Sequence, residues 1–438
     1  MKKWSSFIFA FDTETEKVLF NTRNTGIIAI EKEIYSKISD SLKQPHCTTS
    51  YNEEITQLQE MGFIVDIELD EFDGFFNSVI QSRDKENMLL ISLMTTTNCN
   101  FACRYCYEDG IKKTYNLDEA VVLALISYIQ NYIDNNTISI VHISLYGGEP
   151  TLSWDFVVFT LEKVKKICDA RGIRMVTSML TNGFLLDKQK ALDLIPFNFN
   201  SIQVTLDGSK DFHDKRRYTE KGEPTFDVIL SNIHDLIQVS DNVKVNIRMN
   251  CDKENIESIP ELAECIYNNF GSDRVAINFG YIIVNPSKEN NHSTTPCLSD
   301  INITEQSFAE QLPTLFASIA KYGFKTPEYY HFDGYCAAKT NHCFTLHPSG
   351  DIYKCLTMVG IEEQRAGTVF DVKQFENYFN KDAYLECIKK KCCFLPLCHA
   401  GCPYNSLVKY NDVSKVYCKK EQLIEVNKRF ILAKLSID

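Results

Sequence analysis

The sequence lacks the features that would place the protein in a membrane, on a nucleic acid or outside the cell. None of its apolar runs reaches the roughly 18 to 20 residues that span a bilayer. The net charge of -12 argues against a nucleic-acid partner, which usually needs a basic face. The opening MKKWSSFIFAF begins like a signal peptide, but the acidic DTETE ends its apolar stretch at once. We therefore expect a cytoplasmic protein with no membrane partner and no nucleic-acid partner.

The unusual stretch CNFACRYCY (99–107) also lacks a nearby fourth metal ligand. Cys99, Cys103 and Cys106 are crowded together, and no further cysteine or suitably placed histidine follows closely. A closed structural metal site needs four ligands. Three thiolates can instead hold three irons of a 4Fe-4S cluster and leave the fourth iron open to a reactant. The alternative is a zinc knuckle with a distant fourth ligand.

Cysteine is abundant elsewhere, with 17 residues in the 438-residue chain and nine of them between positions 336 and 418. Cytosolic thiols stay reduced, so clustered cysteines more often bind metal or perform chemistry than form disulfides. Five cysteines stand alone, and we expect these to be small buried hydrophobic residues: Cys47, Cys168, Cys251, Cys265 and Cys297.

The middle of the chain alternates between two apolar patterns. Six β-branched apolar runs suit buried parallel strands, at 88–94, 138–146, 173–180, 200–206, 243–250 and 274–283. Five helical periodicities separate them, at 117–133, 154–170, 188–195, 226–237 and 256–270. This order predicts consecutive βα units, in an open sheet or a partial barrel.

Four motifs directly follow the first four of these strands: CNFACRYCY, then GGEP (147–150), TNG (181–183) and DGSKDFHD (207–214). Active sites of such folds lie at the carboxyl ends of the strands, so we expect all four on one rim.

These motifs resemble the radical S-adenosylmethionine (SAM) superfamily. CNFACRYCY is similar to its C-x3-C-x2-C loop, GGEP to its glycine-rich motif, and TNG and TLDGSKDFHDKRR (205–217) to further family stretches. The resemblance implies a partial (β/α)6 barrel. It also implies that SAM chelates the open iron of a 4Fe-4S cluster and is cleaved to a 5'-deoxyadenosyl radical.

The resemblance also suggests which residues contact SAM. Gly147 and Gly148 would let the backbone approach the methionine moiety, and Glu149 would accept from its ammonium. Tyr105 would lie against the adenine, Thr205 would bond a ribose hydroxyl, and Arg217 would reach the carboxylate. A flavodoxin- or ferredoxin-type protein would donate the electron. The sequence indicates no catalytic acid or base.

The C-terminal cysteines resemble the SPASM extension of radical enzymes, which carries two auxiliary 4Fe-4S clusters. The spacing C-x13-G-x4-C runs from Cys336 to Cys355, and C-x5-C-x3-C runs from Cys392 to Cys402. The resemblance assigns one cluster to Cys336, Cys343, Cys355 and Cys402. It assigns the other to Cys387, Cys392, Cys398 and Cys418. With the cluster in the barrel, the expected total is three.

One ligand of the second cluster departs from the family pattern. The usual C-x2-C would place a cysteine at Lys389, whereas here the nearest upstream cysteine is Cys387 and an extra Cys393 adjoins Cys392. We favour Cys387 with a two-residue bulge, over Cys393 or an incompletely ligated cluster. Paired zinc ribbons are the alternative for the whole region.

The first block is predicted to be a small α+β domain, with a hairpin over 7–30 followed by two amphipathic helices. It resembles the winged-helix-like elements of radical enzymes that modify ribosomally made peptides (RiPPs). Such elements bind a leader peptide as an added strand. A stabilising N-terminal cap is the alternative. We expect four parts: 1–86 for leader recognition, 87–300 as the radical SAM barrel, 301–334 as a helical bridge and 335–438 as the SPASM domain with a C-terminal helix.

The expected function is that of a peptide maturase, which installs a thioether or a carbon–carbon cross-link in a leader-bearing precursor. The alternative is an anaerobic sulfatase-maturating enzyme that makes formylglycine. Such enzymes typically carry an aspartate after the G-x4-C cysteine, where this sequence has Leu356, and they usually begin close to the cluster loop. A non-enzymatic electron-transfer or scaffold protein is a further alternative, which the intact GGEP and TLDG motifs disfavour.

Overall fold

The computed structural model describes residues 1–43, 51–84, 87–106, 108, 114–282, 303–330, 336–371 and 378–435, so Cys47 and Cys297 lie outside the described residues. The chain divides into two compact units. The barrel unit comprises Glu86–Thr326 and Asn341–Asn377. The cysteine-rich unit comprises Met1–Lys85, Pro327–Thr340 and Tyr378–Asp438.

Six parallel strands form the centre of the barrel unit, as the sequence predicts. They are β6 (Met88–Met94), β7 (Ile140–Tyr146), β8 (Arg174–Thr181), β9 (Phe199–Thr205), β10 (Lys244–Cys251) and β11 (Val275–Tyr281). Each strand pairs with the next one in sequence, which is the arrangement that successive βα units produce. The mixed α/β fold with a parallel sheet is therefore confirmed.

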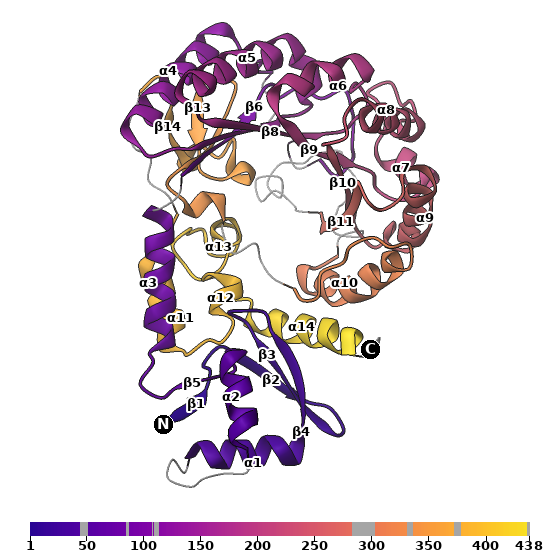
Figure 1. Cartoon of the computed structure of the whole chain (residues 1–438). Helices are drawn as coiled ribbons and strands as arrows, with labels where there is room; N and C mark the ends of the chain where they lie inside the picture. Colours follow the sequence, from indigo (N-terminus) through magenta and orange to yellow (C-terminus); the bar gives the residue numbers. More distant parts are fainter. Residues whose placement is uncertain are drawn as a thin grey trace. The chain divides into compact units, whose positions relative to one another are not determined.

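Helices cover the outer side of this sheet (Figure 1). They are α4 (Glu119–Asn135), α5 (Trp154–Arg171), α6 (Lys188–Leu194), α7 (Lys210–Arg216), α8 (Phe226–Val239), α9 (Ile259–Phe270) and α10 (Glu305–Ala320). Aspartates cap two of them: Asp118 accepts from the Val121 amide and Asp187 from the Lys190 amide, each at 2.9 Å. These helices cover the apolar side chains on the outer face of the strands.

A hairpin from late in the chain extends the sheet. Strand β12 (Cys343–Leu346) pairs in parallel with β6, and β13 (Asp351–Tyr353) pairs antiparallel with β12. Gly350 occupies the turn with φ +91°, a conformation that favours glycine. Strand β14 (Arg365–Thr368) completes the sheet of nine described strands. The attachment of this hairpin to β6 brings Leu356 to the barrel interior.

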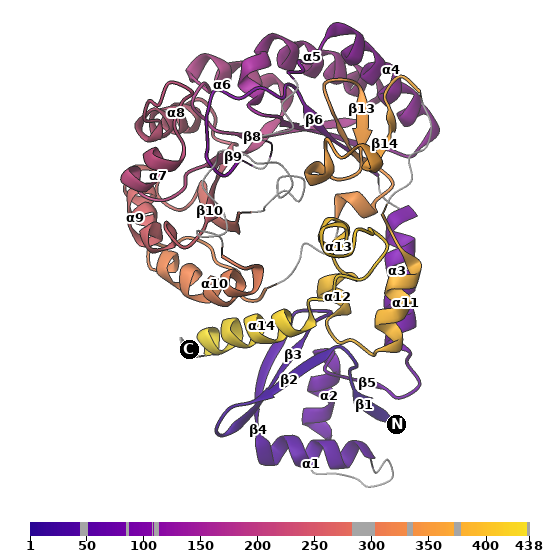
Figure 2. The same cartoon turned by 180° about the vertical axis from the view of Figure 1, so that it is seen from behind.

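The cysteine-rich unit contains two small sheets (Figure 2). Strand β1 (Lys2–Trp4) pairs with β5 (Ile64–Asp66), and β2 (Ile8–Asp12), β3 (Glu16–Asn21) and β4 (Ile27–Glu31) form an antiparallel sheet in that order. The helices are α1 (Lys32–Lys43), α2 (Asn52–Glu60), α3 (Glu71–Asp84), α11 (Lys381–Lys389), α12 (Leu395–Cys398), α13 (Pro403–Tyr410) and α14 (Lys420–Leu435).

The two ends of the chain share hydrophobic cores in this unit. Phe7, Phe72 and Phe75 pack with Tyr384 and Leu395 in one cluster. A second cluster joins the β2–β3 hairpin to α14, through Phe9, Phe11, Val18, Phe20, Phe394, Leu397, Leu423 and Ile431. Each buried phenylalanine contributes about 1.5 to 3 kcal/mol. The N-terminal segment therefore stabilises the region that holds the C-terminal cysteines.

No helix in the described ranges combines the length and the apolar character needed to cross a membrane.

Candidate active site

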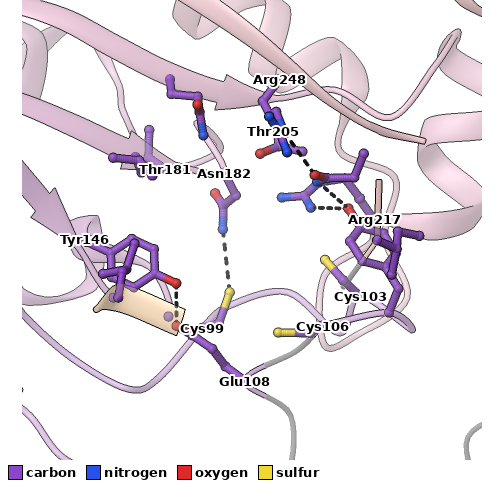
Figure 3. A pocket seen from close by; sticks show the side chains of 18 of the residues that line it. Cys99, Cys103, Cys106, Glu108, Tyr146, Thr181, Asn182, Thr205, Arg217 and Arg248 are labelled. Atoms are coloured by element: carbon purple, nitrogen blue, oxygen red, sulfur yellow. Dashed lines mark hydrogen bonds between the residues drawn. The ribbon is translucent and has the colours of Figure 1, made fainter. Parts of the chain in front are cut away.

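A cavity of about 430 Å³ opens among the loops that follow the parallel strands (Figure 3). Its volume is in the range of small-molecule sites. Its lining includes Cys99, Cys103, Tyr105, Cys106, Glu108, Tyr146, Gly147, Gly148, Leu180, Thr181, Asn182, Gln203, Thr205, Arg217, Arg248, Asn250, Tyr281, Ile282 and Leu356. Residues of the first three motifs, and Thr205 and Arg217 on either side of the fourth, thus line one cavity.

The three cysteines of the first loop all line this cavity. The loop is held in place by main-chain contacts: the Ala102 amide donates to the Tyr218 carbonyl at 3.0 Å, and the Cys106 amide to the Cys103 carbonyl at 3.1 Å. Burial raises the pKa of the Cys99 thiol to about 12. Binding of a metal or cluster, which needs thiolates, would release the protons that these thiols otherwise keep.

In the described part of the chain, no three ligand side chains converge tightly enough to hold a single metal ion. A 4Fe-4S cluster makes no such demand, because each thiolate binds a different iron. Three thiols that share one cavity, without meeting at one point, fit a cluster with an open iron. The residues present therefore suit this cofactor.

The glycines of GGEP allow β7 to end close against the cysteine loop. The Gly148 amide donates to the Thr96 carbonyl at 2.9 Å, and the Glu149 amide to the Asn98 carbonyl at 2.8 Å. A Cβ at Gly147, where φ is +147°, would lie 2.5 Å from the Thr96 oxygen. A side chain at either glycine would therefore push the two loops apart. Their contact with SAM stays a prediction.

Glu149 is fully buried and is not among the residues that line the cavity. Its carboxylate accepts from the Thr151 hydroxyl and the Thr181 hydroxyl, both at 2.6 Å, and from the Asn182 amide at 2.7 Å. Burial raises the pKa of Glu149, while these hydrogen bonds lower it. In this structure Glu149 links the ends of β7 and β8. Its predicted contact with the SAM ammonium is untested.

Tyr105 and Arg217 lie together in a buried polar network. The Arg217 guanidinium donates to the Tyr105 hydroxyl at 2.6 Å, and that hydroxyl donates to the Asp207 carboxylate. Burial raises the pKa of Tyr105 well above its usual range. Arg216, the last residue of α7, forms a buried ion pair with Asp252 at 2.7 Å. This network fixes α7 beside the cysteine loop and presents Arg217 to the cavity.

Thr205 lines the cavity at the end of β9, as its motif predicts. The structure adds contacts that sequence reasoning missed, one of them made by Asn182 of the TNG motif. The Asn182 side chain donates to the Cys99 sulfur at 3.8 Å, and the Tyr146 hydroxyl to the Glu108 carboxylate at 2.7 Å (Figure 3). Position at the carboxyl end of a strand was the signal available for Asn182 and Tyr146.

Part of the cavity wall is apolar. Leu356 and Leu180 line it and pack on a cluster that contains Met94, Tyr146, Tyr353 and Val359. Leu356 begins a short 3-10 turn directly after Cys355. The position that is typically aspartate in sulfatase-maturating enzymes is therefore part of the cavity wall, and here it is a leucine.

The C-terminal cysteines are distributed over both units. Cys343 and Cys355 belong to the barrel unit, and the others belong to the cysteine-rich unit: Cys336, Cys387, Cys392, Cys393, Cys398, Cys402 and Cys418. The first four-cysteine set stays a prediction.

Within the second set, burial, with Cys398, Cys392 and Cys418 acting in the same direction, raises the pKa of Cys387 to about 12. These three are the partners that the resemblance assigns to Cys387. Burial, followed by the charge of the neighbouring Cys392, raises the pKa of Cys393 to about 11. Cys392, Cys393 and Cys398 all pack against the hydrophobic cluster of the β2–β3 hairpin, and Cys387 packs against the other cluster. The choice of Cys387 as the ligand stays a prediction.

Comparison with known proteins agrees with this geometry. Residues 93–266 match the family model of the radical SAM superfamily. A cysteine-type anaerobic sulfatase-maturating enzyme from Clostridium novyi is 25% identical over 71% of this chain and 86% of its own length. A serine-type enzyme from Bacteroides thetaiotaomicron is also 25% identical, over 72% of this chain and 82% of its own.

Two solved structures share the fold. The enzyme anSMEcpe, with bound AdoMet and the Kp18Cys peptide, matches with a TM-score of 0.60 and 20% identity over 80% of this chain and 97% of its own. SuiB from Streptococcus suis, bound to S-adenosylmethionine, matches with a TM-score of 0.53 and 16% identity over 95% of this chain and 99% of its own. The family match covers β7 to β10 and the loop that carries the three cavity cysteines, so residues 93–266 match a radical SAM domain.

Proposed function

We propose that this protein is a radical SAM peptide maturase that installs an intramolecular cross-link, most simply a thioether, in a leader-bearing precursor peptide. The observation that carries the proposal is the cavity in which Cys99, Cys103 and Cys106 meet the GGEP loop and Arg217. When bound there, a 4Fe-4S cluster and SAM would supply a 5'-deoxyadenosyl radical. The residues around it would bind SAM and hold the peptide.

The proposed reaction removes two hydrogens from the peptide. One hydrogen atom goes from a peptide carbon to the deoxyadenosyl radical and leaves as 5'-deoxyadenosine. The cysteine sulfur of the peptide then bonds to that carbon, its proton leaves, and one electron must be accepted. We assign that electron to an auxiliary 4Fe-4S cluster of the C-terminal cysteines. A reduced flavodoxin- or ferredoxin-type protein supplies the electron that starts each turnover, in the cytosol, where thiols stay reduced.

The apolar wall supports the cross-linking reaction over formylglycine formation. Leu356 cannot accept a proton, and it stands where sulfatase-maturating enzymes typically carry an aspartate. Leu180 and Ile282 line the cavity with it, so this side suits an apolar peptide segment. The sulfatase-maturating relatives, at 25% identity, keep formylglycine formation as the second candidate.

The edge of the N-terminal sheet supports binding of a leader peptide. Strand β4 pairs with β3, and no other described strand pairs with it. The Asn21 amide donates to the Gly26 carbonyl, and the Lys32 amide to the Thr15 carbonyl. Because antiparallel pairing alternates, the amides of Ile27, Ala29 and Glu31 point away from β3. A peptide strand can pair with these groups.

The likeness to SuiB covers 95% of this chain, whereas the likeness to anSMEcpe covers 80%. The fold of nearly the whole chain, and not only of its barrel, is therefore shared with SuiB. This likeness supports a peptide maturase that uses its N-terminal segment. We propose four functional parts: 1–86 for leader recognition, 87–300 as the radical SAM barrel, 301–334 as a helical bridge and 335–438 as the SPASM domain.

Anaerobic reconstitution tests the proposal. With SAM and a chemical reductant, the protein should bind close to three 4Fe-4S clusters and release 5'-deoxyadenosine. Stoichiometric zinc without acid-labile sulfide would refute it. Clusters without any cleavage of SAM would instead favour the electron-transfer alternative.

A further inference from the structure

Buried lysines accompany the C-terminal cysteines. Among the described residues, the buried lysines are Lys339, Lys354 and Lys419, and each lies within three positions of a predicted cluster ligand. Removing an ammonium from water costs several kcal/mol unless an anion or good hydrogen bonds compensate. Three such residues in one stretch of the sequence therefore require an explanation, and Lys339 provides the clearest geometry.

Lys339 is held by main-chain groups that adjoin cysteines. Its ammonium donates to the His399 carbonyl at 2.7 Å and to the Gly401 carbonyl at 2.6 Å. These carbonyls lie directly after Cys398 and directly before Cys402. Its own amide donates to the Cys336 carbonyl at 2.8 Å. The charged group is therefore fixed beside cysteines from both predicted auxiliary sets, and all of these residues belong to the cysteine-rich unit.

No carboxylate compensates this charge in the described ranges, where no ion pair involves Lys339 and its side chain is only 9% exposed. Burial lowers the pKa of Lys339 on balance, although Cys336, Cys398, Cys402 and Cys387 act to raise it. Arg83 lines a small cavity together with Lys339 and Cys336 and adds a second positive charge. The available counter-anions are thiolates or what they bind.

We propose that Lys339 is a buried counter-cation of the auxiliary clusters and raises the reduction potential of at least one of them. A 4Fe-4S cluster with four thiolate ligands is an anion, and reduction adds another negative charge. A fixed positive charge in a buried, low-dielectric site favours the reduced form. The clusters would thereby become better acceptors for the electron that cross-linking releases. This inference rests on the proposed function.

The test separates the charge of Lys339 from its hydrogen bonds. Lys339→Gln keeps donors for the two carbonyls but removes the charge, whereas Lys339→Met removes both. Lys339→Arg keeps the charge, and Lys37→Met removes an exposed lysine from the same unit as the matched control. All variants would carry Cys99→Ala, Cys103→Ala and Cys106→Ala, so that only auxiliary clusters contribute. Redox titration monitored by electron paramagnetic resonance gives the potentials.

We expect both neutral variants to lower the potential of an auxiliary cluster by at least 59 mV, which is a tenfold change for a one-electron couple. Lys339→Arg and Lys37→Met should stay near the parent value. Unchanged potentials in both neutral variants, or a change in Lys339→Met alone, would overturn the counter-cation role. If the neutral variants lose iron, retention of iron by Lys339→Arg supports it, and loss in all three refutes it. A parent without auxiliary clusters would refute the proposed electron route instead.

Discussion

The cysteines of the barrel unit and those of the cysteine-rich unit are arranged in different ways. Cys99, Cys103 and Cys106 come from one short loop and line an open cavity. Cys336, Cys387 and Cys402 come from separate segments, and a buried lysine lies among them. Near the first group the buried cations are arginines that pair with acids, such as Arg216 with Asp252. Near the second, Lys339 pairs with main-chain carbonyls.

This difference indicates two uses of iron–sulfur chemistry. The open loop leaves room for a reactant beside the metal, so it suits the cleavage of SAM. The dispersed cysteines join distant segments and can ligate clusters fully, so they suit electron storage and stabilisation of the fold. The two groups should therefore respond differently to loss of their ligands.

The largest effect is expected from removal of the loop cysteines. Replacing Cys99, Cys103 and Cys106 by alanine should abolish formation of 5'-deoxyadenosine, because no thiolate then holds the cluster that binds SAM. Roughly two thirds of the iron should remain, in the auxiliary clusters. Chromatographic assay of 5'-deoxyadenosine and iron analysis check this. Cys265→Ala, at a half-buried position on α9, is the control. Nucleoside release by the triple variant would contradict the assignment.

Loss of a C-terminal cluster ligand should uncouple SAM cleavage from cross-linking instead of stopping both. Cys402→Ala or Cys418→Ala should still cleave SAM but form no cross-linked peptide, because the electron of the last step has no acceptor. Parallel assays of nucleoside and peptide product measure this. Cys387→Ala should behave in the same way and Cys393→Ala should keep activity. The reverse result would make Cys393 the ligand.

Arg217→Ala should weaken the binding of SAM without preventing cluster assembly. A charge-assisted hydrogen bond contributes about 1.5 to 3 kcal/mol, which corresponds to roughly a 10- to 150-fold increase in Kd. Equilibrium binding of SAM to the reconstituted protein measures the change. Arg171→Ala, at an exposed pair with Asp134, should leave Kd unaltered. An equal Kd for both variants would contradict a contact between Arg217 and SAM.

A smaller effect is expected at the sheet edge. Ala29→Pro removes one outward amide of β4, and we expect roughly a two- to tenfold loss of leader affinity with unchanged cleavage of SAM. Ala29→Val keeps the amide and is the control. Fluorescence anisotropy with a labelled leader peptide gives the affinities. Deletion of residues 1–85 would not test leader binding alone, because Phe7, Phe72 and Phe75 belong to the hydrophobic core of the C-terminal region. Equal leader affinity in both variants would exclude pairing along β4.

The sequence predicts the local features of the fold well. Strands β6 to β11 are apolar and β-branched, and their helices have clear periodicity, so both follow from residues close in the chain. Helix α7 was not predicted as a helix, because KDFHDKR offers few apolar residues. The pairing of β12 with β6 joins segments about 250 residues apart, and the shared core of the two chain ends joins residues that are even farther apart in the sequence. No local pattern encodes such contacts.

The candidate site shows the same limit. The cysteine loop and GGEP are short motifs, and the structure places both at one cavity. The burial of Glu149 depends on Thr181 and Asn182 from the next strand, so its motif did not reveal it. Leu356 reaches the cavity only through the β12–β13 hairpin. Lys339 is an ordinary lysine in the sequence until its buried position among cysteines is known.

High-resolution mass spectrometry of a precursor peptide, co-expressed with the protein under anaerobic conditions, tests the central claim most directly. The precursor would be a leader-bearing peptide encoded beside this protein, and iodoacetamide labelling would count its free thiols. The account predicts a product lighter by two hydrogens, with one fewer free thiol if the link is a thioether and an unchanged count if it joins two carbons. A cysteine or serine converted to formylglycine, or a peptide of unchanged mass despite active cleavage of SAM, would contradict it.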